Sequence, residues 1–106
     1  MAIDAIALHM TDNVATAVQD LKVGQEATVR INHDVCHIIL QEDIPYGHKF
    51  TLKPVHFGEE ILKYGEIIGR ATKDIGAGYH AHVQNIESLR GRGDLKTKQS
   101  GNMSSP

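Results

Sequence analysis

A short phrase recurs four times along the chain and constrains its fold more than any other feature. Each copy has a polar residue, an Asp, an aliphatic residue, two further residues and a Gly, with Pro in place of the Asp in one copy. The copies occupy residues 19–24, 42–47, 53–58 and 73–78. The Asp can accept hydrogen bonds from the backbone just ahead of it, and the Gly can adopt a positive φ. We therefore predict one kind of turn, reused between the strands of a compact β domain, with its aliphatic residue in the core.

The segments around these turns have the alternation and composition of short strands. Ala27, Val29 and Ile31 alternate with polar residues, which is typical of a strand with one buried face. Further strands are predicted at residues 3–8, 35–40, 61–62, 67–68 and 79–83. Residues 14–21 fit two patterns, because their aliphatic residues match both the helical spacing and the period of two of a strand. Periodicity alone leans toward a helix there.

Length and charge exclude several classes of function. The 106 residues suit one domain, and 11 basic against 13 acidic residues give a net charge of −2. This balance does not provide the clustered basic surface that nucleic-acid binding needs. No apolar run approaches the roughly 20 residues of a membrane-spanning helix, and the N-terminus lacks the basic region of a secretory signal. We expect a cytoplasmic protein that binds neither nucleic acid nor membranes.

The composition changes after Ser88. Residues 90–94 read Arg-Gly-Arg-Gly-Asp, and the run that follows to Pro106 is polar. Such a run cannot bury enough apolar surface to offset the entropy lost on ordering. We therefore assign residues 1–95 to the folded domain and residues 96–106 to a flexible tail. The two arginines could alternatively dock on an acidic surface of a partner.

The histidines are the first candidates for chemistry. If residues 79–84 form a strand, His80, His82 and Gln84 share one face. Two imidazoles at this spacing can bind one divalent metal, although two ligands make an incomplete set. The alternative is an ordinary polar face of a strand.

Two short polar clusters are further candidates. Gly47-His48-Lys49 ends one of the repeated turns, where the His and the positively charged Lys could bind a carboxylate or a hydroxyl-rich substrate. Lys63-Tyr64-Gly65 is a second cluster of this type. A solvent-exposed turn is the alternative for each cluster. No pair of carboxylates is recognisable as an acid and a base.

Four longer phrases, taken together, resemble one protein family. They are Asp12 to Ala15, Ile44 to Phe50, Ile61 to Gly69 and Gly78 to Asn85. They resemble the SAF domain of the altronate and galactarate dehydratases, over nearly the whole chain from about Ile3 to Leu95. The resemblance implies a mostly β fold of the SAF type, called a β-clip, and this favours a strand at residues 14–18.

The resemblance also implies a function. In this family the SAF domain precedes a much larger catalytic domain or forms a separate small subunit, and we expect this chain to be the small subunit, partnered by a large catalytic dehydratase subunit. The implied reaction is elimination of water from a sugar-acid substrate, which gives a 2-keto-3-deoxy acid, with iron or another divalent metal as cofactor. Loss of the proton beside the carboxylate builds negative charge that a metal or a Lys can stabilise.

The resemblance assigns roles to seven residues of this sequence, and an eighth, His80, lies outside the family's pattern but shares the strand face of His82. His48 and His82 are expected to be catalytic, and His82, with His80 on the same strand face, is expected to hold the metal. The residues expected to bind substrate are Asn13, Lys49, Lys63, Tyr64 and Asn85. Gln84 stands where the family commonly has a second His, so this sequence departs from the family's two-His arrangement.

Three alternative functions stay open on the sequence. The chain could be the small subunit of a sulfolactate sulfo-lyase, which resembles the dehydratase in domain and in elimination chemistry. It could be a non-catalytic SAF module that binds carbohydrate. It could also be a free-standing metal-binding protein built on its histidines.

Overall fold

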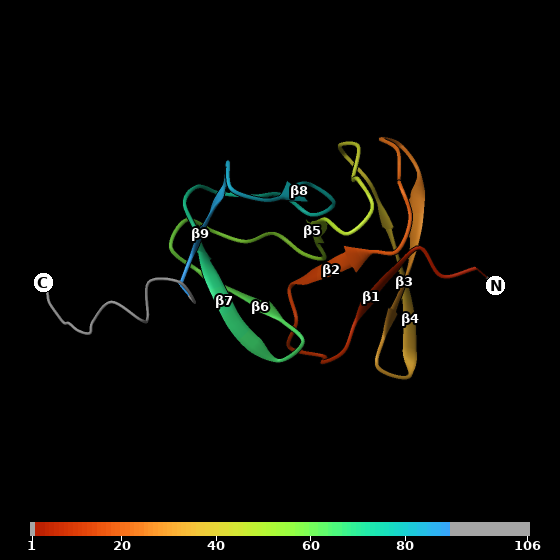
Figure 1. Cartoon of the computed structure of the whole chain (residues 1–106), viewed down its shortest axis with the longest axis horizontal. Coiled ribbons are helices and arrows are strands. Elements are labelled where there is room, and N and C mark those ends of the chain that lie inside the picture. Colours follow the sequence, from red (N-terminus) through yellow and green to blue (C-terminus); the bar gives the residue numbers. More distant parts are fainter. Residues whose placement is uncertain (1, 90–106) are drawn as a thin grey trace, which may run out of the picture.

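A computed structural model describes residues 2–89, and every regular element in this range is a strand (Figure 1). The strands are β1 (Ala5–Ala7), β2 (Val14–Ala17), β3 (Glu26–Ile31), β4 (Asp34–Ile39), β5 (Lys49–Thr51), β6 (Glu60–Lys63), β7 (Glu66–Ala71), β8 (His80–Ala81) and β9 (Ile86–Ser88). The predicted mostly β domain is confirmed. A helix able to cross a bilayer is absent from these residues. The predicted domain end at residue 95, the tail at 96–106 and the arginine-containing segment at 90–94 lie outside the described range.

The strands form two sheets. The larger sheet has the order β4-β3-β1-β2-β5-β8, and the smaller has the order β6-β7-β9. In Figure 1 the smaller sheet lies at the left, and β2, β5 and β8 lie between it and β1, β3 and β4. The β1–β3 pair is parallel and the other pairs are antiparallel. The two ends of the larger sheet approach each other, since Gln41 N, just after β4, donates a hydrogen bond of 2.9 Å to Gly78 O, just before β8.

Strand β2 occupies the segment whose period was ambiguous. The lean of periodicity toward a helix was wrong, and the strand implied by the family resemblance is what the structure contains. Strand β2 pairs with β1 on one side and with β5 on the other, so sheet neighbours satisfy its backbone. Val14 and Ala15 are consecutive in the chain and both buried, since the strand lies between two groups of core residues.

The four copies of the repeated phrase do form one kind of turn, and the turns associate in two pairs. Isolated bridges join Leu21 to Ile44 and Val55 to Ile75, and these four aliphatic side chains are at most 4% exposed. The glycines that end the turns have φ between 82° and 86°. The predictions of a buried aliphatic residue and of a Gly with positive φ are confirmed.

The Asp residues of these turns act differently from the prediction. Each accepts a hydrogen bond from the backbone of the partner turn, and not from the residues just ahead of it. The bonds, 2.8–2.9 Å long, run from Tyr46 N to Asp20, from Val23 N to Asp43 and from Phe57 N to Asp74. The tips of paired turns face each other, so the backbone N–H group nearest to each Asp belongs to the partner turn. Pro54 replaces the Asp of the fourth turn and has no side-chain acceptor to offer.

The core consists of two clusters of buried residues. The first lies along the larger sheet and includes Leu21, Leu40, Ile44 and Phe50. The second joins the two sheets and consists of Val14, Val55, Ile61, Ala71, Ile75 and Ala81.

The predicted strand at residues 79–83 is shorter than expected. Only His80 and Ala81 are extended, because the chain turns immediately after them, and Val83 is 81% exposed at that turn. The side chain of Val83 therefore makes no contribution to the core.

Candidate functional site

Three histidine rings meet where β5 pairs with β8. Lys49 lies opposite Ala81, and Phe50 lies opposite His80. His48 directly precedes β5 and His82 directly follows β8, so the two residues lie at the same end of this antiparallel pair, and their rings are stacked. The His80 ring stacks with both of them. The ring centroids are 4.6 Å apart for His48 and His82, 5.1 Å for His48 and His80, and 5.5 Å for His80 and His82.

The ring nitrogens of this histidine cluster (His48, His80 and His82) converge. Each ring offers one nitrogen, and these atoms lie within 4.8 Å of one another. His48 Nδ1 and His80 Nε2 are 2.9 Å apart, at hydrogen-bonding distance. All three residues are partly buried. Such a group of convergent imidazoles can serve as a ligand set for a transition metal.

The surroundings favour the neutral form of two of the rings. Burial lowers the pKa of His80, and the neighbouring His48 and His82 lower it further, whereas Glu42 acts in the opposite direction. Burial also lowers the pKa of His82, together with His48 and Lys49. Desolvation and nearby positive charge both disfavour protonated imidazole. A neutral imidazole keeps the lone pair that a metal needs.

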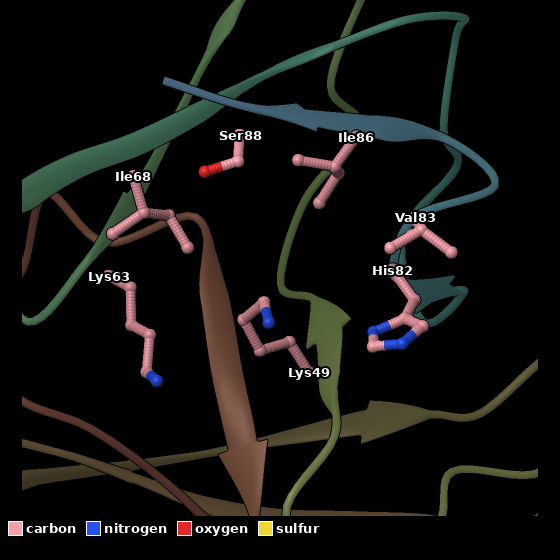
Figure 2. Close-up of a pocket in the computed structure, with 7 residues that line it drawn as sticks. All are labelled: Lys49, Lys63, Ile68, His82, Val83, Ile86 and Ser88. Atoms are coloured by element: carbon pink, nitrogen blue, oxygen red, sulfur yellow. The ribbon is translucent and has the colours of Figure 1, made fainter. Parts of the chain in front are cut away.

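A cavity of about 320 Å³ lies beside the cluster (Figure 2). Its lining residues are Lys49, Lys63, Ile68, His82, Val83, Ile86 and Ser88. Burial lowers the pKa of Lys49, and the charge of Lys63 lowers it further, so the two ammonium groups influence each other. Two neighbouring cations next to an imidazole make a cavity suited to an anion such as a carboxylate.

The structure thus brings together five of the eight residues singled out in the sequence. Lys49, Lys63 and His82 line the cavity, and His48 and His80 contact His82. The remaining three, Asn13, Tyr64 and Asn85, lie outside its lining.

Asn13 and Tyr64 occupy other positions. The Asn13 amide donates to Glu60 O at 2.9 Å and accepts from Leu62 N at 2.8 Å, and the residue is only 8% exposed. The side chain of Asn13 therefore joins the start of β2 to β6. Tyr64 has a φ of 55° in the β6–β7 turn, and Lys63 Nζ lies 5.1 Å from the centre of the Tyr64 ring.

Asn85 lies directly behind two of the histidines. Its side chain accepts a hydrogen bond from His82 N and donates one to His80 O, each 2.9 Å long. The adjacent Gln84 places its amide nitrogen 3.3 Å from His80 Nδ1. These contacts hold the segment that carries His80 and His82.

Sequence reasoning missed several residues of the site. Ile68, Ile86 and Ser88 line the cavity because β7 and β9 lie side by side, with Gly69 opposite Ser88. Glu42 Oε1 accepts a hydrogen bond of 2.9 Å from His80 N, although the two residues are far apart in the chain. The sequence predicted a strand that includes Ile68, but not its position in the cavity. No local pattern distinguishes Ser88 or Glu42 as neighbours of the histidines.

Comparison with known proteins places this arrangement in a family. A model of the altronate/galactarate dehydratase SAF domain matches residues 3–89. The altronate dehydratase of Escherichia coli is 42% identical over 83 residues, which are 78% of this chain and 16% of that protein. The altronate dehydratase of Bacillus subtilis is 36% identical over 83 residues, again 16% of that protein.

A smaller relative matches over almost its full length. The (2R)-sulfolactate sulfo-lyase subunit alpha of Chromohalobacter salexigens is 30% identical over 93 residues, which are 85% of this chain and 99% of that subunit. The chain therefore spans a small part of the altronate dehydratases and nearly all of the sulfo-lyase subunit. With the family model matching residues 3–89, the chain belongs to the altronate/galactarate dehydratase SAF domain family.

Proposed function

We propose that this SAF domain is the small subunit of an altronate-dehydratase-type lyase, which removes water from a sugar acid together with a larger catalytic subunit. The observation that carries the proposal is the meeting of the histidine cluster with two lysines at one cavity. The altronate dehydratases among its relatives support the choice of reaction.

The lysines are proposed to bind the substrate carboxylate. Removal of the proton on the carbon beside the carboxylate places negative charge on the carboxylate oxygens. Lys49 and Lys63 can stabilise that charge from the cavity wall. The C–O bond on the next carbon then breaks, the departing hydroxide takes up the proton that the base removed and leaves as water, and the resulting enol becomes the 2-keto-3-deoxy acid.

The histidine cluster is proposed to hold a divalent metal, with iron as the expected ion. Three imidazoles with convergent nitrogens fit such a group, because three protein ligands leave a coordination position open in catalytic sites. Imidazole ligands also suit iron. When bound, the metal would polarise substrate oxygens and stabilise a departing hydroxide. In this proposal His48, His80 and His82 would hold the ion beside the cavity, which His82 also lines.

The proposed larger subunit would supply what this cavity lacks. Among residues 2–89, the cavity lining includes no Asp or Glu that could remove the substrate proton. The altronate dehydratases have most of their length outside the matched region. We assign the general base to that larger part.

The second candidate is the small subunit of a sulfolactate sulfo-lyase. The specific observation in its favour is the match over 99% of a sulfo-lyase subunit alpha. A sulfolactate carboxylate would meet the same two lysines, so the cavity described here suits either acid.

The test is reconstitution. The chain would be co-purified with a larger protein that matches the remainder of altronate dehydratase, and assayed anaerobically with Fe²⁺ for formation of a 2-keto-3-deoxy acid from altronate. Sulfolactate would be assayed in parallel. His82→Ala and Lys49→Met should each lower the rate of the complex, and Lys73→Met, a change of an exposed lysine away from the cavity lining, is the matched control.

Each outcome decides between the candidates. Turnover of altronate that requires both chains and His82 would support the dehydratase. Turnover of sulfolactate alone would favour the sulfo-lyase. Full activity after loss of both His82 and Lys49 would refute the catalytic role of this cavity and leave a non-catalytic module.

A further inference from the structure

We infer that Asn85 is a positioning residue that holds His80 and His82 so that their rings meet His48. The inference rests on the proposed metal site, because it concerns the residues that would form it. It begins from the position of β8 at the edge of the larger sheet.

Strand β8 has a sheet neighbour on one side only. Its partner is β5, at the end of the strand order β4-β3-β1-β2-β5-β8. The backbone groups of His80 bond to side chains: His80 N donates to Glu42 Oε1, and His80 O accepts from Asn85 Nδ2, each at 2.9 Å. These side chains supply the partners that a further strand would otherwise provide.

The Asn85 amide spans both histidines. Its Nδ2 donates to His80 O, while its Oδ1 accepts from His82 N at 2.9 Å. Asn85 N also donates to His82 O at 3.0 Å, which closes the turn between them. One side-chain amide therefore replaces one peptide group of a missing neighbouring strand, and it links two residues whose rings belong to the cluster.

Burial makes these bonds consequential. Asn85 is only 7% exposed, so water cannot readily replace its amide. Removal of the amide leaves His82 N without its acceptor and leaves His80 O with only the longer bond of 3.4 Å from Gln84 Nε2, and the strand ends at Ala81. The segment 82–85 would then lose its position relative to β5, which carries the chain from His48.

The chain contains a matched control for this arrangement. Asn13 is 8% exposed, and its amide donates to Glu60 O and accepts from Leu62 N. Glu60 and Leu62 are two residues apart, as His80 and His82 are. Asn13→Ala and Asn85→Ala therefore each remove one donated and one accepted backbone bond at similar burial, but only Asn85 contacts histidines.

The experiment compares metal affinity in these variants. The tag-free chain would be titrated anaerobically with Fe²⁺ by calorimetry as wild type, Asn85→Ala, Asn13→Ala and His82→Ala. We expect Asn85→Ala to weaken Fe²⁺ binding about 10- to 100-fold, the usual effect of losing a group that supports metal ligands. Asn13→Ala should stay within about twofold of wild type, although both variants lose similar stability.

A second readout does not depend on metal. Nuclear Overhauser contacts between the ring protons of His48 and His82 should be present in wild type and in Asn13→Ala, and lost in Asn85→Ala. If Asn85→Ala does not fold, Asn85→Ser, which retains one hydrogen-bonding group, is measured in the same way.

The outcomes separate this inference from the proposed function. Absence of Fe²⁺ binding in wild type would refute the metal site, while loss of the ring contacts in Asn85→Ala alone would still support positioning. Unchanged ring contacts and unchanged affinity in Asn85→Ala would overturn the inference, as would equal losses of affinity in the Asn85→Ala and Asn13→Ala proteins.

Discussion

Asp12 provides the sharpest test of how this fold is held together. Its carboxylate accepts four backbone hydrogen bonds, from Leu8 N at 3.0 Å, His9 N at 3.2 Å, Tyr64 N at 3.0 Å and Gly65 N at 2.8 Å. The residue is 3% exposed. Tyr64 and Gly65 both have positive φ in the two-residue turn between β6 and β7, which directs their adjacent N–H groups toward one acceptor. Asp12 therefore joins the β1–β2 connection to the smaller sheet.

The cost of Asp12→Asn follows from these bonds. The Asn keeps one carbonyl oxygen, so at least one buried N–H faces an amide nitrogen, at about 1–3 kcal/mol. The remaining hydrogen bonds are accepted by a neutral amide oxygen and no longer by a charged carboxylate, which lowers the free energy of unfolding by roughly a further 1 kcal/mol for each bond. Because neighbouring bonds to one group are not additive, we expect a total loss of about 3 kcal/mol. This is a large part of the roughly 5–15 kcal/mol that stabilises a typical domain.

Protonation of the same carboxylate should make the stability of the fold depend on pH. Burial alone would raise the pKa of Asp12, but the hydrogen bonds from Gly65, His9, Leu8 and Tyr64 outweigh burial and lower it below its ordinary value. A carboxyl whose folded pKa is lowered stabilises the fold above its unfolded pKa of about 3.9 and loses this contribution as the pH falls through the folded pKa. The stability difference between wild type and Asp12→Asn should therefore be constant from about pH 7 to 5 and shrink below about pH 4.

Urea unfolding followed by circular dichroism at pH 7, 5, 4 and 3 measures both effects. Asp34→Asn, which changes an exposed carboxylate, is the control and should stay within about 0.5 kcal/mol of wild type. A difference below about 1 kcal/mol between wild type and Asp12→Asn at pH 7 would refute the proposed role of the four bonds. A difference that does not change between pH 7 and pH 3 would refute the role of the charge.

Two further predictions concern a turn and the cavity. Gly78 has a φ of 82°, and a Cβ there would lie 2.3 Å from Ile39 O, whereas Gly24 has a φ of 85° and open space around it. Gly24→Ala should therefore lower the free energy of unfolding by only about 1–2 kcal/mol. Gly78→Ala should lower the urea midpoint clearly more than Gly24→Ala. Equal midpoints would contradict the close approach of β4 and β8. In the proposed lyase complex, Lys49→Met should reduce kcat/KM about 10- to 150-fold, because a charged hydrogen bond contributes roughly 1.5–3 kcal/mol. Lys49→Arg should retain more of the activity, and an unchanged kcat/KM in Lys49→Met would exclude carboxylate binding by Lys49.

Much of the local structure could be predicted from the sequence. The repeated phrase correctly indicated turns that end in a Gly with positive φ and bury one aliphatic residue, because both properties depend on residue type and on near neighbours. The strand around Val29 was equally clear from alternation. The partner of each turn Asp was not predictable, since Asp20 and Tyr46 are brought together only by the pairing of two turns.

Local pattern failed where strand pairing decides the conformation. The segment from Val14 to Ala17 fits two periods, and it is a strand because β1 and β5 flank it on both sides. Residues 79–83 have the alternation of a longer strand, yet β8 ends at Ala81, where the Asn85 side chain bonds the backbone of the next residue and closes a turn. Neither pairing partner is encoded within the segment itself.

The sequence by itself determined the family, the mostly β class, the Gly and the buried aliphatic residue of each turn, and the identity of the polar residues that merited attention. Only the tertiary structure decided that His48 meets His80 and His82, since this depends on the register in which Lys49 pairs with Ala81. The tertiary structure also placed the buried Asn85 amide behind the histidines, and it brought Lys49 of β5 and Lys63 of β6 to one cavity beside them. A register between strands some 30 residues apart is set by the whole core, because a slip of one residue would turn every side chain to the opposite face.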